Sequence, residues 1–295
     1  MDVANEGATA SLFTNPAFVE DCRRRFGLSY HVSYAFNCAD SVSFAEKDVL
    51  EVGGSLPPAF VFDVLGAKTW TAIETPEYED SLAEAGGITH KGTLLHTKTE
   101  VIPTRGFGKP FAASYNFLLA TIEDLPEDHE QQYDLVFSIA TFEHIQKMPA
   151  ALDRMYRALK PGGKLFSMFS PIWSAHDGHH LPEMVDASGR PVDRNVIPPW
   201  GHLLARPAEM YRYLCTRTDP ETAGKMVYYI YQAPFINRLF NEDYFSYIAQ
   251  TPFKAINVTR IFNVSVPPNT QSALAALYPG RKYFDNDGLY LVLEK

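Results

Sequence analysis

The residues best suited to proton chemistry gather in two places along the chain. Glu143 and His144 stand side by side after an apolar run. A later region rich in proline and tryptophan contributes four more histidines, which are His176, His179, His180 and His202. Histidine ionises near neutral pH, so it can take a proton from a hydroxyl or an amine as a bond forms. We expect the catalytic residues among five side chains, namely Glu143, His144, His176, His179 and His180.

A glycine turn earlier in the chain predicts a cofactor site. The run Asp48–Ser55 reads DVLEVGGS, in which a short apolar strand ends at Gly53 and Gly54. Glycines let the backbone turn tightly beneath a ligand. The next apolar run ends in Glu74, roughly 20 residues later, which is the distance at which a βαβ unit places an acid on ribose hydroxyls. The pattern favours a cofactor that contains adenosine.

The residues after these glycines disfavour a dinucleotide. A loop that binds a pyrophosphate needs a third glycine where this chain has Pro57 and Pro58. A cofactor without phosphate therefore fits better than NAD, and an NAD-dependent oxidoreductase is the weaker enzymatic hypothesis.

Alternating strands and helices must position these residues. The expected strands are Asp48–Val52, Thr69–Ile73, Asn116–Ile122, Tyr133–Ile139, Lys164–Ser170, Ala255–Phe262 and Asp287–Lys295. The expected helices follow Pro57 and span Ala150–Leu159 and Asn241–Ala249. This alternation is typical of an α/β fold with a doubly wound, mostly parallel sheet, whose ligands lie beyond the carboxyl ends of the strands.

The run Tyr133–Phe166, which reads YDLVFSIATFEHIQKMPAALDRMYRALKPGGKLF, resembles the class I S-adenosylmethionine-dependent methyltransferases, closest to their small-molecule group. The resemblance extends from about Val49 to Phe169 and returns more weakly over Asn241–Lys295. It implies a seven-stranded, Rossmann-like methyltransferase sheet with S-adenosyl-L-methionine as the cofactor.

The same resemblance implies roles for individual cofactor-binding residues. Glu51, Gly53 and Gly54 would line the methionine side, and Glu74 would accept the ribose hydroxyls. The adenine and the sulfonium would be met by four further residues, which are Thr121, Ile122, Ser138 and Ile139. Thr121 stands where the family commonly has an acid, and Glu123 or Asp124 would serve in an alternative register.

A divalent metal is a further implication of the resemblance. Some members of the family bind a metal through an E-x-x-E-H motif with a later histidine. Here the sequence from Ala140 reads ATFEH, so the first acid is missing. A site formed by Glu143, His144 and one or two of His179, His180 and His202 stays open, as does a pocket-lining role for His144.

We expect four units along the chain. Residues 1–45 form an N-terminal helical cap, 46–170 the cofactor-binding core, 171–235 a substrate-binding insertion after strand five, and 236–295 the completion of the core sheet. Candidate substrate contacts in the insertion are Trp173, Trp200, His202 and Arg206.

Composition limits the partners and the location. The formal charge of −9 disfavours nucleic acid, whose binding requires clustered basic residues. The three cysteines form no C-x-x-C pair, and the N-terminal residues carry no basic segment followed by an apolar one, so we expect a cytoplasmic protein without a membrane partner. A homodimer through the cap or the insertion stays open.

These observations favour a methyltransferase that acts on a small molecule with a histidine as general base. O-methylation of a sugar or secondary metabolite is favoured, and N-methylation is an alternative. A non-enzymatic alternative is a degenerate methyltransferase domain that serves as a non-catalytic partner subunit, for which Thr121 and the imperfect glycine loop would be symptoms.

Overall fold

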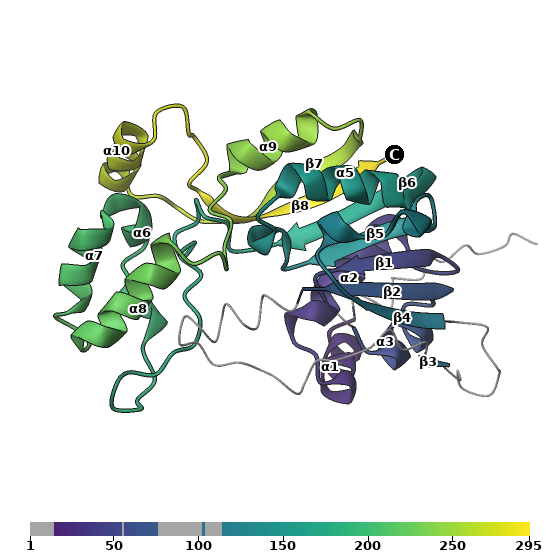
Figure 1. The fold of residues 1–295 in the computed structure, drawn as a ribbon, viewed down its shortest axis with the longest axis horizontal. Coiled ribbons are helices and arrows are strands. Elements are labelled where there is room, and N and C mark those ends of the chain that lie inside the picture. The colour runs from purple at the N-terminus through teal and green to yellow at the C-terminus, as the bar shows by residue number, and fades with distance from the viewer. Residues whose placement is uncertain (1–14, 55, 76–101, 104–113) are drawn as a thin grey trace, which may run out of the picture.

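An eight-stranded sheet forms the centre of the molecule, with the strand order β3-β4-β2-β1-β5-β6-β8-β7 (Figure 1). The computed structural model describes residues 15–54, 56–75, 102–103 and 114–295. The strands are β1 (Asp48–Val52), β2 (Thr69–Glu74), β3 (Ile102–Pro103), β4 (Ser114–Leu119), β5 (Tyr133–Ile139), β6 (Leu159–Phe169), β7 (Lys254–Asn263) and β8 (Asn286–Glu294).

Most neighbouring strands run parallel. Strands β4, β2, β1, β5 and β6 form the parallel part, while β8 is antiparallel to β6 and β7 is antiparallel to β8. The predicted mostly parallel sheet of seven strands is confirmed, and the two-residue β3 adds an antiparallel edge beside β4. The parallel strands β1, β2, β4, β5 and β6 end along one edge, which we call the carboxyl edge.

Several predicted boundaries agree with the structure. Strands β1 and β5 and helix α9 (Asn241–Ala249) begin and end as expected. Helix α9 starts cleanly because the backbone N–H of Phe240 donates to the Asp243 carboxylate at 2.9 Å, which satisfies a donor at the helix start. The strands predicted at Thr69–Ile73, Ala255–Phe262 and Asp287–Lys295 differ from β2, β7 and β8 by a single residue at their ends.

The strand predicted over Asn116–Ile122 was placed too late. Strand β4 ends at Leu119, and Ile122 begins a short 3-10 helix, η2 (Ile122–Asp124). The Thr121 hydroxyl donates to the Asp124 carboxylate at 2.9 Å, and such a local side-chain bond favours a turn over an extended strand. The apolar run continued through this turn because Ile122 is itself a core residue.

The boundary between helix and strand near Pro161 was also misplaced. Helix α5 spans Met148–Ala158 rather than Ala150–Leu159, and β6 begins at Leu159 rather than at Lys164. The backbone of Gly162 and Gly163 bonds to the main chain of Lys295 at 3.1 and 3.0 Å. These bonds keep the glycine turn within the extended segment.

Helices cover both faces of the sheet (Figure 1). Helices α1 (Pro16–Phe26), α2 (Tyr30–Val42) and α3 (Pro58–Asp63) share a buried apolar cluster with one face. Helices α5 and α9 pack on the other face. Within residues 15–54, 56–75, 102–103 and 114–295, no helix is both long and apolar enough to cross a membrane.

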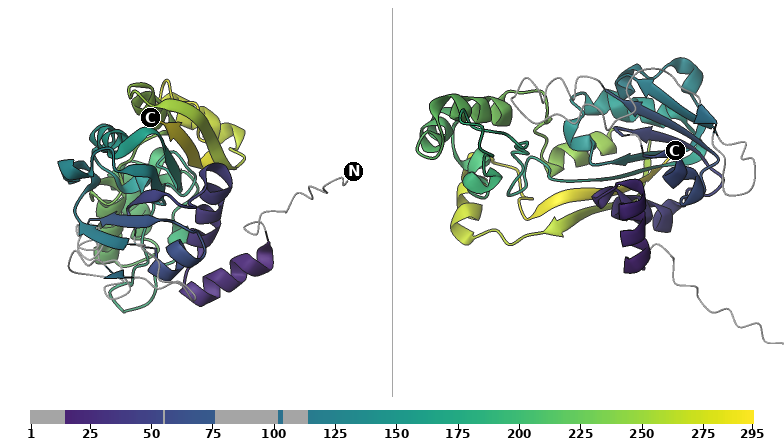
Figure 2. Two further views of the ribbon diagram at one scale, coloured as in Figure 1. Left: turned by 90° about the vertical axis from the view of Figure 1, so that its right-hand side faces the viewer. Right: turned by 90° about the horizontal axis from the view of Figure 1, so that it is seen from below.

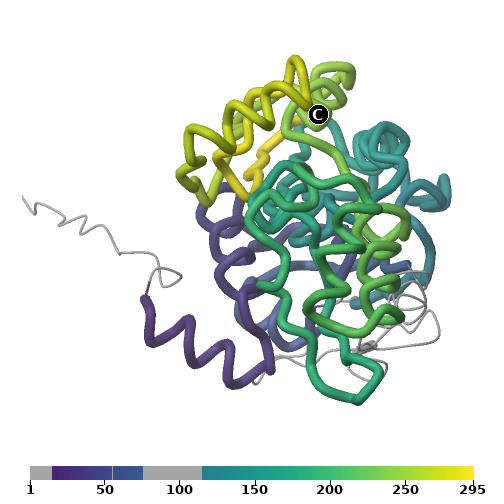
Figure 3. Tube along the Cα trace, turned by 90° about the vertical axis from the view of Figure 1, so that its left-hand side faces the viewer, coloured from purple at the N-terminus to yellow at the C-terminus, as the bar shows by residue number. Residues whose placement is uncertain are grey.

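A separate helical lobe lies beyond the sheet (Figures 1 and 2). It contains α6 (Gly201–Leu204), α7 (Pro207–Leu214), α8 (Pro220–Tyr231) and α10 (Pro268–Leu277). Its buried apolar cluster joins residues of the 171–240 region with Leu274 and Phe284, which belong to the connection between β7 and β8. Viewed from the side of the lobe, its chain lies in front of the sheet (Figure 3). The domain limits expected from the sequence stay predictions.

Candidate active site

The glycine loop after β1 is fitted against the loop after β5. Gly53 has φ +79°, and its N–H donates to the carbonyl of Ile73 at 2.9 Å. A Cβ atom on Gly53 would lie 1.9 Å from the Thr141 side chain, so only glycine fits. The Thr141 hydroxyl donates to the carbonyl of Gly53 at 3.0 Å, which ties the two loops together at the carboxyl edge.

Glu51 supports this loop from below. Its carboxylate is buried, and it accepts hydrogen bonds from the Trp70 indole at 2.7 Å and from the Leu56 backbone at 3.0 Å. Burial raises the pKa of Glu51 to about 7, against the opposite effect of these two bonds. A Cβ on Gly54 would lie 2.8 Å from this carboxylate. Glu51 and both glycines therefore form one unit, and their contact with the cofactor's methionine part stays a prediction.

The residues predicted for ribose and adenine lie on the neighbouring strand ends. Glu74 is the last residue of β2, and its carboxylate accepts a hydrogen bond from the backbone of Thr75 at 2.9 Å. The Thr121 hydroxyl donates to Asp124, whereas the Ile122 side chain is buried in the apolar core. Glu74 and Thr121 lie at the carboxyl edge, where a ligand of this sheet is expected.

Ser138 and Ile139 end strand β5. The Ser138 hydroxyl is buried and donates to the carbonyl of Val52 at 2.9 Å, so it fastens β5 to β1. Ile139 is the last residue of the strand. The predicted cofactor residues of β1, β2 and β5 thus share one edge of the sheet.

Glu143 is the most unusual polar residue of this edge. It belongs to the short 3-10 helix η4 (Phe142–His144), and its side chain is 1% exposed. Neither carboxylate oxygen accepts a hydrogen bond from another residue of the described segments. Burial raises the pKa of Glu143 to about 8, offset in part by its own backbone. A buried carboxyl group without a partner is costly, so this position is suited to a ligand.

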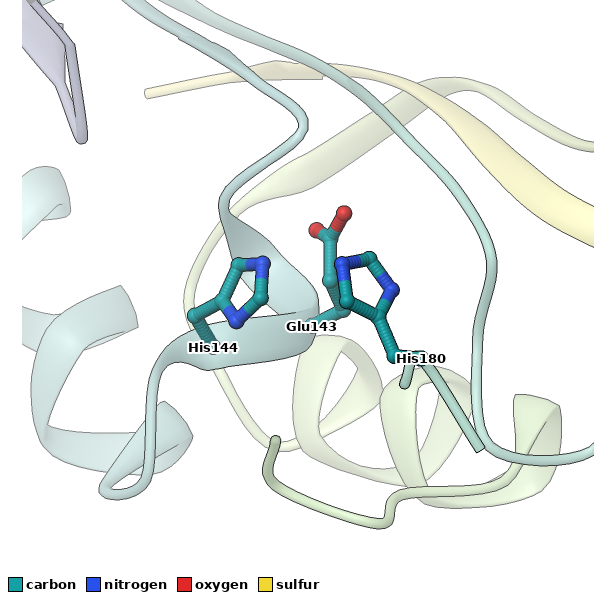
Figure 4. A group of neighbouring side chains, drawn as sticks. All are labelled: Glu143, His144 and His180. Atoms are coloured by element: carbon teal, nitrogen blue, oxygen red, sulfur yellow. The ribbon is translucent and has the colours of Figure 1, made fainter. Parts of the chain in front are cut away.

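Two histidines accompany Glu143 (Figure 4). The His144 Nδ1 atom is 2.6 Å from the carbonyl of Phe235, which identifies it as the donor and leaves Nε2 with the lone pair. The rings of His144 and His180 lie 4.8 Å apart, edge to face. Burial lowers the pKa of His144 to about 4 and lowers the pKa of His180 well below its usual value, so both imidazoles are neutral near pH 7.

Glu143, His144 and His180 each offer one ligand atom, and these atoms lie within 4.8 Å of one another. Both Glu143 oxygens and the His180 Nδ1 atom are buried without a hydrogen-bond partner in the part of the chain that the structure describes. One carboxylate and two neutral imidazoles are donors that divalent transition metals accept. The three residues therefore fit such an ion.

His176 has a different partner. Its Nδ1 atom is 2.8 Å from the carboxylate of Asp287, and the Asp177 carboxylate lies 3.6 Å away. The His176 side chain is 35% exposed. Burial raises the pKa of Asp287, and the bond from His176 counteracts this. A carboxylate that holds one ring nitrogen fixes the tautomer and presents the other nitrogen, which is the arrangement of a general base.

Sequence reasoning missed Asp287. The residue is the second of the terminal strand β8, which runs antiparallel to β6. The beginning of β8 must therefore lie beside the end of β6, where the histidine region follows. An antiparallel assignment of the terminal strand would have brought Asp287 into the set of candidates.

His179 and His202 form a second pair of buried histidines. Both are buried, and their rings lie 5.7 Å apart. The Leu181 backbone donates to His179 Nδ1 at 3.1 Å, and His202 Nε2 bonds to the Trp173 carbonyl at 2.8 Å. Burial lowers the pKa of His179 to about 3 and that of His202 to about 4. The Nδ1 atom of His202 is buried without a hydrogen-bond partner among the described residues, and the roles expected of both histidines stay predictions.

The four candidate substrate contacts are not brought to one surface. Trp173 and Trp200 belong to the buried apolar cluster of the lobe, and the Trp200 indole donates to the Phe284 carbonyl at 3.1 Å. The buried His202 ring lies 4.6 Å from the Trp173 ring. Arg206 is exposed and immediately precedes α7. The aromatic residues of this region therefore serve mainly as the core of the lobe.

Comparisons with known proteins agree with the resemblance seen in the sequence. A family model described as a methyltransferase domain matches residues 78–167. The chain is 27% identical to the ubiquinone/menaquinone biosynthesis C-methyltransferase UbiE of Rhizobium rhizogenes over 77% of this chain and 73% of that protein. It is 29% identical to the protein of the same name from Agrobacterium fabrum, over 54% of this chain and little more than half (56%) of that protein.

Solved structures give matches of low sequence identity. One is an S-adenosylmethionine dependent methyltransferase from Mesorhizobium loti, which is 14% identical with a TM-score of 0.42. The alignment covers 87% of this chain and 94% of that one.

Proposed function

Since this chain is a class I S-adenosylmethionine-dependent methyltransferase, we propose that it methylates a hydroxyl group of a small ring compound, either a sugar or a secondary metabolite. The observation that carries the proposal is the pair formed by His176 and Asp287. A hydroxyl must lose its proton as the methyl group arrives, and an oriented imidazole serves that purpose.

The transfer is a single displacement. The acceptor oxygen forms a bond to the methyl carbon while the bond between that carbon and the cofactor's sulfur breaks. The hydroxyl proton passes to Nε2 of His176, whose Nδ1 stays bonded to Asp287 at 2.8 Å. S-adenosylhomocysteine leaves as the neutral product. Residues of the carboxyl edge contribute by orienting the reactants and excluding water.

Among the candidate histidines, only His176 has a ring nitrogen bonded to a carboxylate within the described residues. Burial holds the pKa of His144 and His202 at about 4 and that of His179 at about 3, so these rings accept a proton reluctantly. Burial also lowers the pKa of His180 well below its usual value. His176 combines partial exposure with a carboxylate partner.

Aromatic side chains support a ring-shaped acceptor. The Tyr34 hydroxyl lies 3.3 Å from the hydroxyl of Ser170, the residue that follows β6. Tyr34 also stacks with Phe262 at 6.4 Å and contacts Tyr30 at 5.4 Å. The side chains of Tyr30 and Phe262 are each 46% exposed. Such ring faces can pack against a flat or sugar ring.

A divalent cation fits the same proposal. Glu143, His144 and His180 would hold it, and when bound it would act as a Lewis acid that polarises the acceptor oxygen. Without a cation, the neutral Glu143 carboxyl group can donate a hydrogen bond to the acceptor.

Carbon methylation is the second candidate, and the matched relatives favour it, since they bear the name C-methyltransferase. Methylation of a ring carbon beside a hydroxyl also requires loss of the hydroxyl proton, so the base would be the same. The identity of the methylated atom in the product distinguishes the two candidates.

The test combines cofactor binding with transfer of a labelled methyl group. Calorimetry should show micromolar binding of S-adenosylhomocysteine, and a panel of phenols, catechols and sugars should reveal a labelled product. His176→Asn should bind S-adenosylhomocysteine as the wild type does and lower kcat by about 10²–10⁴-fold. His129→Asn, a change at a histidine bonded to Tyr133, is the matched control. Failure to bind either form of the cofactor would favour a non-catalytic partner subunit.

A further inference from the structure

The backbone of helix η4 is held by a residue that lies far away in the sequence. The side-chain nitrogen of Asn237 donates to the carbonyls of Phe142 and Ile145 at 2.6 and 3.0 Å. Its backbone N–H donates to the carbonyl of Glu143 at 2.8 Å. One residue thus binds three carbonyls of the segment that carries Glu143 and His144.

Asn237 is itself fixed from the opposite side. Its side-chain oxygen accepts hydrogen bonds from the Leu239 backbone and from the Tyr244 hydroxyl, both at 3.1 Å. The amide is therefore oriented by two donors on its oxygen, and its nitrogen must face η4. The fixed orientation makes Asn237 suited to setting the geometry of that helix.

The residues before Asn237 extend the contact. The carbonyl of Phe235 meets His144 Nδ1 at 2.6 Å, and the carbonyl of Pro234 accepts from the Gln146 side chain at 2.5 Å. We call residues 234–237 the clamp. The clamp bonds to five consecutive residues, 142–146, and it leaves the side chain of Glu143 unbonded.

The clamp continues directly into the helical lobe. The guanidinium of Arg238 donates to the carbonyls of Tyr229, Ile230, Ala233 and Ile236 at 2.8–3.2 Å. Tyr229 and Ile230 belong to helix α8, so Arg238 ties the clamp to the end of that helix.

We propose that Asn237 is a positioning residue that orients Glu143 and His144 for the reaction. The inference rests on the proposed function, in which η4 borders the reacting groups. Misplacement of a reacting group by about 1 Å can reduce the rate by about 100-fold, so the three carbonyl bonds are expected to matter for kcat.

Asn237→Asp separates donation from packing, because aspartate has the same shape and retains the acceptor oxygen but cannot donate to Phe142 and Ile145. Amide exchange measured by mass spectrometry gives a readout that needs no acceptor. The amides of His144 and Ile145, which bond to Thr141 and Phe142 at 2.8 and 3.3 Å, should exchange at least ~10-fold faster in this variant. Asn237→Ala should show the same change.

Thr222→Ala is the matched control. Thr222 lies at the other end of α8 and donates to Asp219 at 2.6 Å, so its loss should lower the thermal stability without affecting η4. With an accepted substrate, Asn237→Asp should lower kcat by about 10–100-fold while the affinity for S-adenosylhomocysteine stays within twofold of wild type, and Thr222→Ala should leave kcat unchanged.

Two results would overturn the inference. One is unchanged exchange at His144 and Ile145 in Asn237→Asp, and the other is an equal loss of kcat in Thr222→Ala at a similar loss of stability. The proposed function fails separately, through the absence of cofactor binding or an active His176→Asn variant.

Discussion

The glycine loop and helix η4 lie at the same edge of the sheet, but they treat their polar groups differently. In the loop, Glu51 is bonded to Trp70 and Leu56, and Thr141 is bonded to the carbonyl of Gly53. In η4, the backbone is bonded by the clamp, whereas the Glu143 carboxylate has no partner among the described residues. The first region is complete without a ligand, and the second presents an unsatisfied group on a rigid support.

The comparison indicates a division of labour. A loop whose shape is fixed by its own bonds is preorganised for a cofactor, so binding costs little ordering. Burial without a partner disfavours the ionised carboxylate and therefore raises the pKa of the group, and contact with a ligand can stabilise it. We therefore expect changes in the loop to act on cofactor affinity and changes in η4 to act on chemistry and on the response to pH.

The largest expected effect comes from filling the space at Gly53. Gly53→Ala places a Cβ within 1.9 Å of Thr141 at a positive φ, so the loop must shift. Calorimetry should show at least a 100-fold loss of affinity for S-adenosylhomocysteine. Gly189→Ala is the matched control, because Gly189 also has a positive φ (+82°) but open space around it. Equal affinity in the two variants would contradict the preorganised loop.

The second effect is a pH dependence of stability at Glu143. Its pKa is about 8 in the folded chain and 4.5 for an exposed glutamate, so the proton that it binds stabilises the fold fully below pH 4.5. That contribution is lost as the pH rises through 8. Urea unfolding with a chelator present should show a decline of a few kcal/mol between pH 6 and pH 9.

Glu143→Gln should remove this part of the decline, because the amide does not titrate. The unfolding free energy of the variant at pH 9 should exceed that of the wild type. A wild type and variant with parallel pH profiles would show that Glu143 is ionised at neutral pH and has a partner after all.

The smallest expected effect comes from Ser138, which fastens β5 to β1 beside the glycine loop. Ser138→Ala removes the hydroxyl that donates to the carbonyl of Val52. Loss of one buried hydrogen bond should lower the unfolding free energy by about 1–2 kcal/mol without a change of pH profile. Urea unfolding at pH 7 measures this loss of unfolding free energy. A loss that changes with pH would show that Ser138 is coupled to η4 rather than to the glycine loop.

The bounds of secondary-structure elements could be predicted where the hydrophobic pattern of the segment itself determines them. Strands β1 and β5 are short apolar runs bounded by polar residues, and their limits agree with the prediction. Ile122 was misassigned because a core residue in a 3-10 turn extends the apolar pattern of the strand before it. Local hydrophobicity reports burial and does not distinguish a strand from the turn after it.

The candidate site was accessible only in part, because its partners come from distant segments. Glu143, His144 and His180 were selected by residue type, and the structure brings them together. Asp287 and Asn237 carry no local motif, and their roles follow from the antiparallel β8 and from the chain's return after α8. Trp173 and Trp200 were plausible substrate contacts by composition, yet composition does not separate a lobe's core from a binding wall.

The contact between Gly53 and Thr141 constrains the order in which these two positions can be substituted. A side chain at position 53 is tolerated only after position 141 has lost bulk, so the two substitutions must occur in a fixed order. A smaller residue at position 141 removes the hydroxyl bond to the glycine loop but introduces no clash there. Substitutions at these two positions, which are 88 residues apart, are therefore expected to be coupled.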